Sequence, residues 1–124
     1  MKKSLFLILS ALLFIPSMAS AGISSKGYLN ISDTYMSGSM NVRFNNNVPG
    51  YMMTQEWSNG TITFYGWNGT KSFLCIVPPN TQWFDRAFAA HYNLDNGATL
   101  YVARNTNSTH CTNVVFNKRS NYID

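Results

Sequence analysis

Short runs in which apolar and polar residues alternate, separated by glycine-containing turns, dominate the chain from residue 26 onward. Five runs precede residue 78, at residues 26–31, 36–44, 51–57, 61–67 and 72–77. In the second run, Met40, Val42 and Phe44 alternate with polar residues, which predicts one strand up to residue 44. The Asn-Gly pairs at 59–60 and 68–69 supply the positive φ of tight hairpin turns. The pattern therefore predicts successive antiparallel strands.

One segment follows a helical period instead. Between residues 82 and 93, a stripe at three- and four-residue spacing contains Trp83, Phe84, Ala87, Phe88 and His91. Asn80 or Thr81 is expected to cap the start of this helix, and Asp-Asn-Gly at residues 95–97 to end it.

Residues 98–104 and 112–117 are typical of two further strands. This order predicts a mainly β fold, a small OB-fold-like antiparallel barrel with one helix before the last two strands. A plain β-sandwich would leave the helix unexplained.

The first 21 residues have the pattern of a secretory signal peptide. Lys2 and Lys3 give a positive start, residues 5–15 form an apolar run of eleven, and Ala-Ser-Ala at 19–21 suits cleavage. The run is too short to span a bilayer, which argues against a membrane anchor. We therefore expect residues 22–124 to form a single OB-like β-barrel domain, secreted or periplasmic in a bacterium.

The expected cleavage changes the meaning of the charge. The whole chain has a formal net charge of +4 and a pI near 9.2. Residues 22–124 carry seven basic and five acidic side chains, a net charge of +2, and contain no basic run. Binding to nucleic acid through phosphate contacts is therefore not expected. A charged fraction of 11% with 15% aromatic residues also argues against disorder.

Cys75 and Cys111 are the two cysteines of the chain, so one intramolecular pairing is possible. Exported chains usually form such a disulfide. It would contribute about 3–4 kcal/mol in the chain-entropy model. A metal site needs more ligands than two cysteines and two distant histidines offer, and we expect no metal and no cofactor.

No catalytic motif stands out. His91 lies on the predicted helix stripe and His110 in a polar loop, where both are explained more simply as structural or solvated residues. A ribonuclease-like pair of histidines with a lysine stays open, although no spacing singles it out. The Gly-x-Ser-x-Gly and His-Glu-x-x-His motifs do not occur. We therefore expect a protein that is not an enzyme.

Large aromatic rings point to binding. Trp57, Trp67 and Trp83 accompany several tyrosines in a chain rich in Asn, Ser and Thr. Ring faces stack on the C–H patches of sugars, while amides and hydroxyls bond to sugar hydroxyls. The alternative is that several rings fill the core, which is our interpretation of Trp83.

Two stretches resemble a known family. Residues 33–38, Asp-Thr-Tyr-Met-Ser-Gly, lead into the run that ends at Phe44. The second stretch runs from Cys75 to Trp83, then through the predicted helix to Gly97 and the strand at 98–104. Their order and spacing resemble the B subunits of subtilase cytotoxin and of its pertussis-like and typhoid-toxin-like relatives. The two stretches touch about half of residues 22–124.

The resemblance implies an OB-fold subunit that forms a homopentamer, binds sialylated glycans on host cells and carries a separate catalytic A subunit. The family's serine that contacts sialic acid corresponds to Ser37, and its neighbouring acid corresponds to Asp33. A hydroxyl and backbone N–H groups near Ser37 suit the sugar carboxylate, and Asp33 suits a sugar hydroxyl. Taken alone, the two residues are explained more simply by a turn, in which both residue types are common, and the resemblance alone favours the glycan site.

The chain also departs from the family. A family cysteine is replaced by methionine in Tyr-Met-Met at 51–53, so Cys75 is expected to pair with Cys111. The predicted helix is about one turn shorter, which bears on the pentamer because the family's helices line its central pore. The family's glycan-contacting tyrosine, in the strand after the helix, falls near Ala103 or Arg104. An arginine there would pair with the sialic carboxylate.

Three functions remain. The first is a secreted, non-enzymatic, sialoglycan-binding subunit of a toxin-like assembly, with Asp33, Ser37 and Arg104 at the glycan. The second is a stand-alone periplasmic or secreted binding or inhibitor protein without glycan specificity. The third is a small exported hydrolase or nuclease, which would require His91 or His110 for activity.

Overall fold

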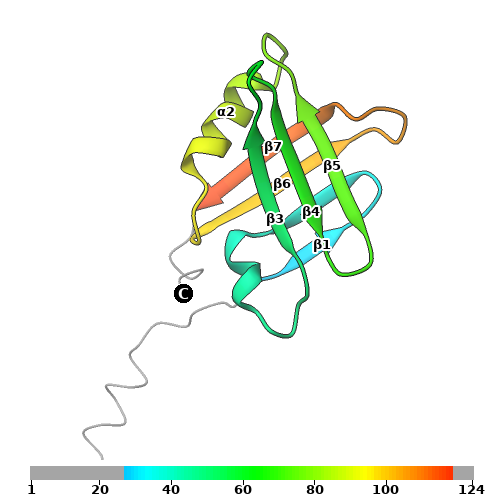
Figure 1. Cartoon of the computed structure of the whole chain (residues 1–124), viewed down its shortest axis with the longest axis vertical. Helices are drawn as coiled ribbons and strands as arrows, with labels where there is room; N and C mark the ends of the chain where they lie inside the picture. The colour runs from blue at the N-terminus through cyan, green and yellow to red at the C-terminus, as the bar shows by residue number, and fades with distance from the viewer. Residues whose placement is uncertain (1–26, 119–124) are drawn as a thin grey trace, which may run out of the picture.

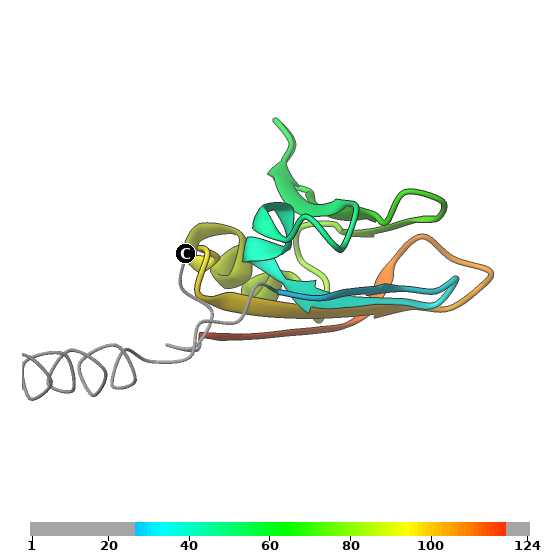
Figure 2. The same ribbon diagram turned by 90° about the horizontal axis from the view of Figure 1, so that it is seen from below.

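The computed structural model describes residues 27–118, which form two antiparallel β-sheets packed face to face (Figure 1). The expected signal peptide, residues 1–21, lies outside the described residues. Seen from below, the sheets form separate layers (Figure 2), and the strands of one sheet cross those of the other.

The four-stranded sheet contains, in spatial order, β1 (Leu29–Ile31), β2 (Tyr35–Ser39), β6 (Ala98–Arg104) and β7 (Cys111–Lys118). The three-stranded sheet contains β3 (Tyr51–Glu56), β4 (Ile62–Trp67) and β5 (Ser72–Val77). A 3₁₀ helix, η1 (Met40–Phe44), joins β2 to β3, and α2 (Phe84–Asn93) joins β5 to β6. The predicted mainly β fold with one helix before the last two strands is confirmed.

Tight turns make β3, β4 and β5 successive hairpins. Gly60 and Gly69 have φ of 89° and 101°, which confirms the prediction that glycines provide the left-handed turn positions. The Asn68 side-chain oxygen accepts a hydrogen bond of 2.8 Å from the Lys71 backbone N–H, which fixes the second turn.

The core lies between the sheets and is built from the inward residue of each alternating pair. The buried side chains include Met36, Leu100, Val102 and Val114 from one sheet, and Ile62, Phe64, Phe73 and Val77 from the other. Burial of each large apolar side chain contributes about 1.5–3 kcal/mol. Because the core fills the interior, the outer faces of the two sheets lie on opposite sides of the molecule.

The sheets are joined along one seam and do not close into a barrel within residues 27–118. A parallel bridge pairs Ile76 with His110, and the Ile76 N–H donates to the Thr109 carbonyl at 2.8 Å. The predicted disulfide between Cys75 and Cys111 is confirmed at the same place. Elsewhere α2 packs against β3, β4 and β7. The result is an open, OB-like arrangement.

The strand predicted for residues 36–44 is wrong in its second half, where η1 replaces it. Two adjacent residues, Asn41 and Val42, are both buried. Adjacent side chains of a strand point to opposite faces, so a strand facing a single core cannot bury both. The alternation of Met40, Val42 and Phe44 was therefore coincidental.

The start of the helix differs from the prediction, and its buried face differs at Phe88. The helix begins at Phe84 without a side-chain cap, and the Thr81 hydroxyl donates to the Pro78 carbonyl instead. Of the predicted stripe, Ala87 is fully buried and Trp83 and Phe84 are partly buried against the core, whereas Phe88 is exposed. Ala90, which lies outside that stripe, is also fully buried. Small side chains on this face let the helix approach the sheets closely.

Candidate functional site

The three sequence-predicted glycan residues lie on the four-stranded sheet and its first turn. Asp33 is exposed in the turn between β1 and β2, Ser37 lies in the middle of β2, and Arg104 ends β6. The structure brings Asp33 and Arg104 into direct contact, while Ser37 lies further along the same sheet.

Arg104 fastens the Asp33 turn to the sheet. Its Nε donates to the Asp33 carbonyl oxygen at 3.1 Å, and its backbone N–H donates to the Thr34 carbonyl at 2.8 Å. Its guanidinium also donates to the Ser108 carbonyl at 3.5 Å and lies 5.5 Å from the centre of the Phe73 ring. Arg104 therefore positions the turn, whatever further contact its side chain makes.

The Asp33 carboxylate has a cation beside it. Lys71 Nζ, from the turn between β4 and β5, lies 3.1 Å from Asp33 Oδ1, and both side chains are well exposed. An exposed pair of this kind contributes little to stability. It does place one negative and one positive group at the edge of the surface that contains Ser37.

Ser37 belongs to a row of directly paired residues across the sheet. Asn30 of β1 lies opposite Ser37, Ser37 lies opposite Tyr101, and Tyr101 lies opposite Val115 of β7. The Tyr101 ring stacks on Tyr35, with centroids 6.0 Å apart and planes inclined by 21°. We call Asp33, Tyr35, Ser37 and Tyr101 the tyrosine surface.

The tyrosine surface can bind a polyhydroxylated ligand. Tyr35 and Tyr101 are 37% and 36% exposed, so their rings remain accessible in part. Their phenols and the Ser37 hydroxyl both donate and accept hydrogen bonds, and Asp33 accepts them. This combination of partly exposed rings and hydroxyls is suited to sugars.

Tyr101 was among the large rings that favour binding in the sequence, but its place opposite Ser37 was not predicted, and the position near Ala103 or Arg104 was expected there instead. A signal was present, because Tyr101 precedes Ala103 by two positions and so lies on the same face of the strand. Which residue lies opposite Ser37 depends on the register between β2 and β6, and these strands are far apart in the sequence.

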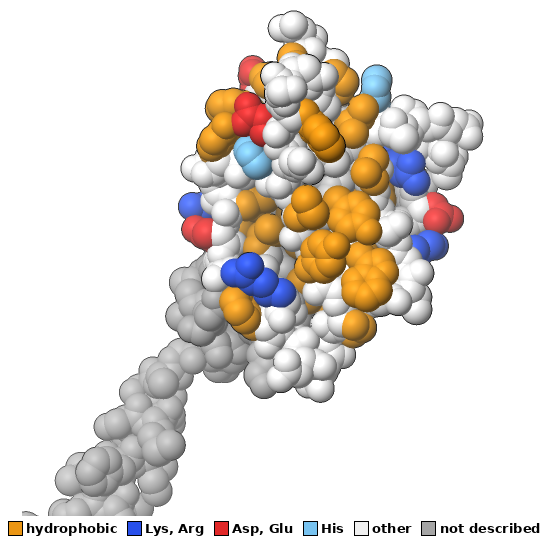
Figure 3. All heavy atoms as spheres, in the orientation of Figure 1, with side chains coloured by type: hydrophobic (Ala, Val, Ile, Leu, Met, Phe, Trp, Pro, Cys, Tyr) orange, Lys and Arg blue, Asp and Glu red, His pale blue; other side chains and the backbone are white. Residues whose placement is uncertain are grey.

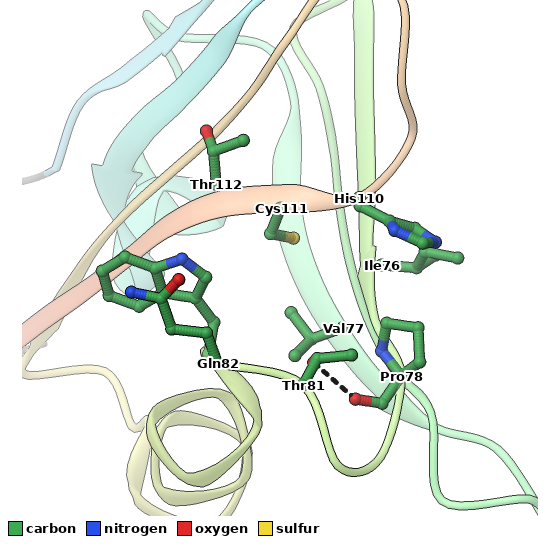
Figure 4. A pocket seen from close by; sticks show the side chains of 9 residues that line it. Ile76, Val77, Pro78, Thr81, Gln82, His110, Cys111 and Thr112 are labelled. Atoms are coloured by element: carbon green, nitrogen blue, oxygen red, sulfur yellow. Dashed lines mark hydrogen bonds between the residues drawn. The ribbon is translucent and has the colours of Figure 1, made fainter.

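The histidines lie on separate elements. His91, in α2, has its Nδ1 2.6 Å from the Thr54 hydroxyl of β3, a contact that joins helix to strand. His110 lines a hollow of about 310 Å³ beside Cys111, at the seam between the sheets (Figure 4). This hollow includes none of Asp33, Ser37 or Arg104.

Within residues 27–118 there is neither a group of metal-binding side chains nor a helix that could span a membrane. No cluster of three or more His, Cys, Asp or Glu side chains there is arranged to hold a metal ion. No helix in this part of the chain has the length and apolar character needed to cross a membrane. The disulfide is compatible with an oxidising compartment.

No protein-family model matches the chain, and no significant match was found among curated proteins or solved structures.

Proposed function

We propose that this protein is a secreted, non-enzymatic subunit that binds sialylated glycans through the tyrosine surface. One observation carries the proposal: Ser37 lies directly opposite Tyr101, whose ring stacks on Tyr35. The serine that the family resemblance assigns to sialic acid therefore has an accessible aromatic ring beside it. Ser37 would donate to the sugar carboxylate and Asp33 would accept from a sugar hydroxyl.

Arg104 acts first as a positioning residue in this proposal. Its bond to the Asp33 carbonyl holds the turn against β6, so the Asp33 side chain projects from a fixed backbone. Lys71 lies 3.1 Å from the same carboxylate and offsets its negative charge, which reduces the repulsion between Asp33 and an anionic sugar.

Assembly into a homopentamer that carries a catalytic A subunit belongs to the same proposal. The outer side of α2 supports it, because Phe88 and Tyr92 are 44% and 60% exposed there. Their ring centroids lie 4.6 Å apart. Exposed aromatic pairs are common where protein surfaces associate.

The test is a glycan array and a sedimentation measurement on the oxidised chain. We expect Ser37→Ala to weaken binding to sialylated glycans about tenfold or more, because a hydrogen bond to a charged group contributes about 1.5–3 kcal/mol. Tyr101→Phe, which keeps the ring, should weaken binding less than Tyr101→Ala. Ser72→Ala, on the exposed face of the other sheet, is the matched control.

The proposal fails if the chain ignores every sialylated glycan, or if Ser37→Ala binds as tightly as the unmodified chain. A monomer that still binds sialylated glycans would contradict the proposed pentamer and leave the proposed glycan binding intact.

A further inference from the structure

A second hollow lies on the outer face of the three-stranded sheet, on the opposite side of the molecule from the tyrosine surface, at the turn between β3 and β4. The turn is closed by two backbone hydrogen bonds of 2.9 Å, from the Gly60 N–H to the Trp57 carbonyl and from the Trp57 N–H to the Thr61 carbonyl. The hollow has a volume of about 460 Å³, within the usual range for small-ligand sites. Its lining residues are Trp57, Ser58, Asn59, Thr61, Thr63, Leu74 and Ile76, which we call the Trp57 hollow.

The Trp57 ring forms a fixed wall of this hollow. Its Nε1–H donates to the Thr63 hydroxyl at 2.7 Å, which restrains the indole against the sheet. The side chain is nevertheless 52% exposed, so the ring does not belong to the core. A large apolar ring that is held in place and accessible is preorganised for binding, because it loses little conformational entropy when a ligand binds.

The floor of the hollow is apolar and its rim is polar. Leu74 and Ile76 contribute the floor from β5, and Ile76 lies directly opposite Thr63 in the sheet. Ser58, Asn59 and Thr61 bring hydroxyl and amide groups to the rim.

None of the seven lining side chains is ionisable, so a charged ligand would lose hydration without gaining an opposite charge. The lining therefore suits an uncharged ligand that has both C–H faces and hydroxyls.

Further rings continue from the hollow along the same face. Hydrophobic side chains gather at the centre of this face (Figure 3). Tyr65 lies opposite Leu74 in the sheet, and the Tyr51 ring lies 6.0 Å from Tyr65 and 6.3 Å from Trp67. A chain of several sugar units bound at Trp57 would find a second stacking surface here.

We propose that the Trp57 hollow binds a neutral hexopyranose unit of an oligosaccharide. The sugar stacks a C–H face on the indole, and its hydroxyls bond to Ser58, Asn59 and Thr61 at the rim. This site is independent of the tyrosine surface, because the core separates the outer faces of the two sheets.

Calorimetric titration of the oxidised full chain tests the proposal, with lactose, cellotetraose and maltotetraose as neutral probes and the methyl α-glycoside of sialic acid, which contains no neutral hexose, as the anionic probe. We expect at least one neutral probe to bind, and Trp57→Ala to raise its Kd about tenfold or more, since tenfold corresponds to about 1.4 kcal/mol. Trp57→Phe keeps a smaller ring, so its Kd should lie between those of the unmodified chain and of Trp57→Ala. Circular dichroism and the melting temperature identify any variant that fails to fold.

Ser37→Ala separates this proposal from the proposed function. It should leave binding of the neutral probes unchanged while it weakens binding of the methyl sialoside. Trp57→Ala should weaken binding of the neutral probes and leave binding of the methyl sialoside unchanged. The proposal is overturned if no neutral probe binds, if Trp57→Ala binds as the unmodified chain does, or if Ser37→Ala abolishes neutral binding. Self-association that depends on Trp57 and is indifferent to sugar would identify the face as an interface between copies instead.

Discussion

The Tyr92 phenol of α2 donates a hydrogen bond to the Glu56 carboxylate at the end of β3. Ionisation of the phenol would break this bond and place a second negative charge beside the carboxylate. Both effects raise the pKa of Tyr92 above its ordinary value of 10.0. The contact is therefore complete below that value and is lost as the pH rises through the pKa of Tyr92.

We expect Glu56→Gln to lower the pKa of Tyr92 toward 10.0. An alkaline titration followed by ¹³C NMR of the tyrosine Cζ atoms resolves the individual phenols, and Tyr92→Phe assigns the signal. A Tyr92 titration that is the same with and without Glu56→Gln would show that the carboxylate does not control this phenol.

At the scale of single residues, the disulfide was predictable from the sequence, and the contacts between other side chains were not. The Cys75–Cys111 pair was predictable because the chain offers one pairing. The Arg104 contacts were not, because its carbonyl acceptors belong to a turn and a loop whose shapes appear only in the folded chain. The pairing of Tyr101 with Ser37 was not predictable for a related reason, since strand register depends on the whole sheet.

Two turn glycines allow the conformational effect to be separated from the steric one. Gly50 and Gly69 have φ of 117° and 101°, so alanine at either position is strained by about 1–3 kcal/mol. A Cβ on Gly50 would also lie 1.9 Å from the Trp67 carbonyl oxygen, whereas one on Gly69 would lie 3.3 Å from the Pro49 side chain.

We therefore expect Gly50→Ala to lower the free energy of unfolding by about 1–3 kcal/mol more than Gly69→Ala does. Urea unfolding of the two variants beside the unmodified chain measures the difference. Equal losses would mean that the backbone around Trp67 can move away at no cost.

At the scale of elements, the sequence predicted best where glycine turns bound a clear alternation. The expected strands at 72–77 and 98–104 have the bounds of β5 and β6. The prediction failed at residues 40–44, where the sequence alternates as a strand does but forms a short 3₁₀ helix. In α2, the predicted stripe was right at Trp83, Phe84 and Ala87 and wrong at Phe88, because the close approach to the sheets buries the small side chain of Ala90 instead.

The disulfide joins the two sheets at their seam. Cys75 of β5 and Cys111 of β7 are 36 positions apart, and both are buried beside the parallel bridge of Ile76 and His110. We expect the double variant Cys75→Ala, Cys111→Ala to lose about 4 kcal/mol of unfolding free energy. Denaturant unfolding measures the loss, and mass spectrometry after alkylation without reduction checks that the unmodified chain has no reactive thiol. A loss below about 1 kcal/mol would contradict a major role for this link.

At the scale of the whole molecule, the order of strands and helix was predictable, and the failure of the two sheets to close into a barrel was not. The element order and the closure of the barrel involve the same strands, yet closure also depends on how many residues of β5 and β7 pair with each other. Here the pairing is limited to the bridge between Ile76 and His110. Hydrophobic periodicity carries no information about such a limit.

The strand order has a consequence in time. The three-stranded sheet needs only residues 51–77, which are consecutive in the chain, whereas the four-stranded sheet places β6 beside the early strand β2 and β7 beside β6. Local hairpins form quickly, and pairings between distant segments form slowly. Because a chain is synthesised from its N-terminus, the Trp57 hollow can form before β6 and β7 have been synthesised. The tyrosine surface has to wait for β6, so the two faces of one small domain mature at different moments.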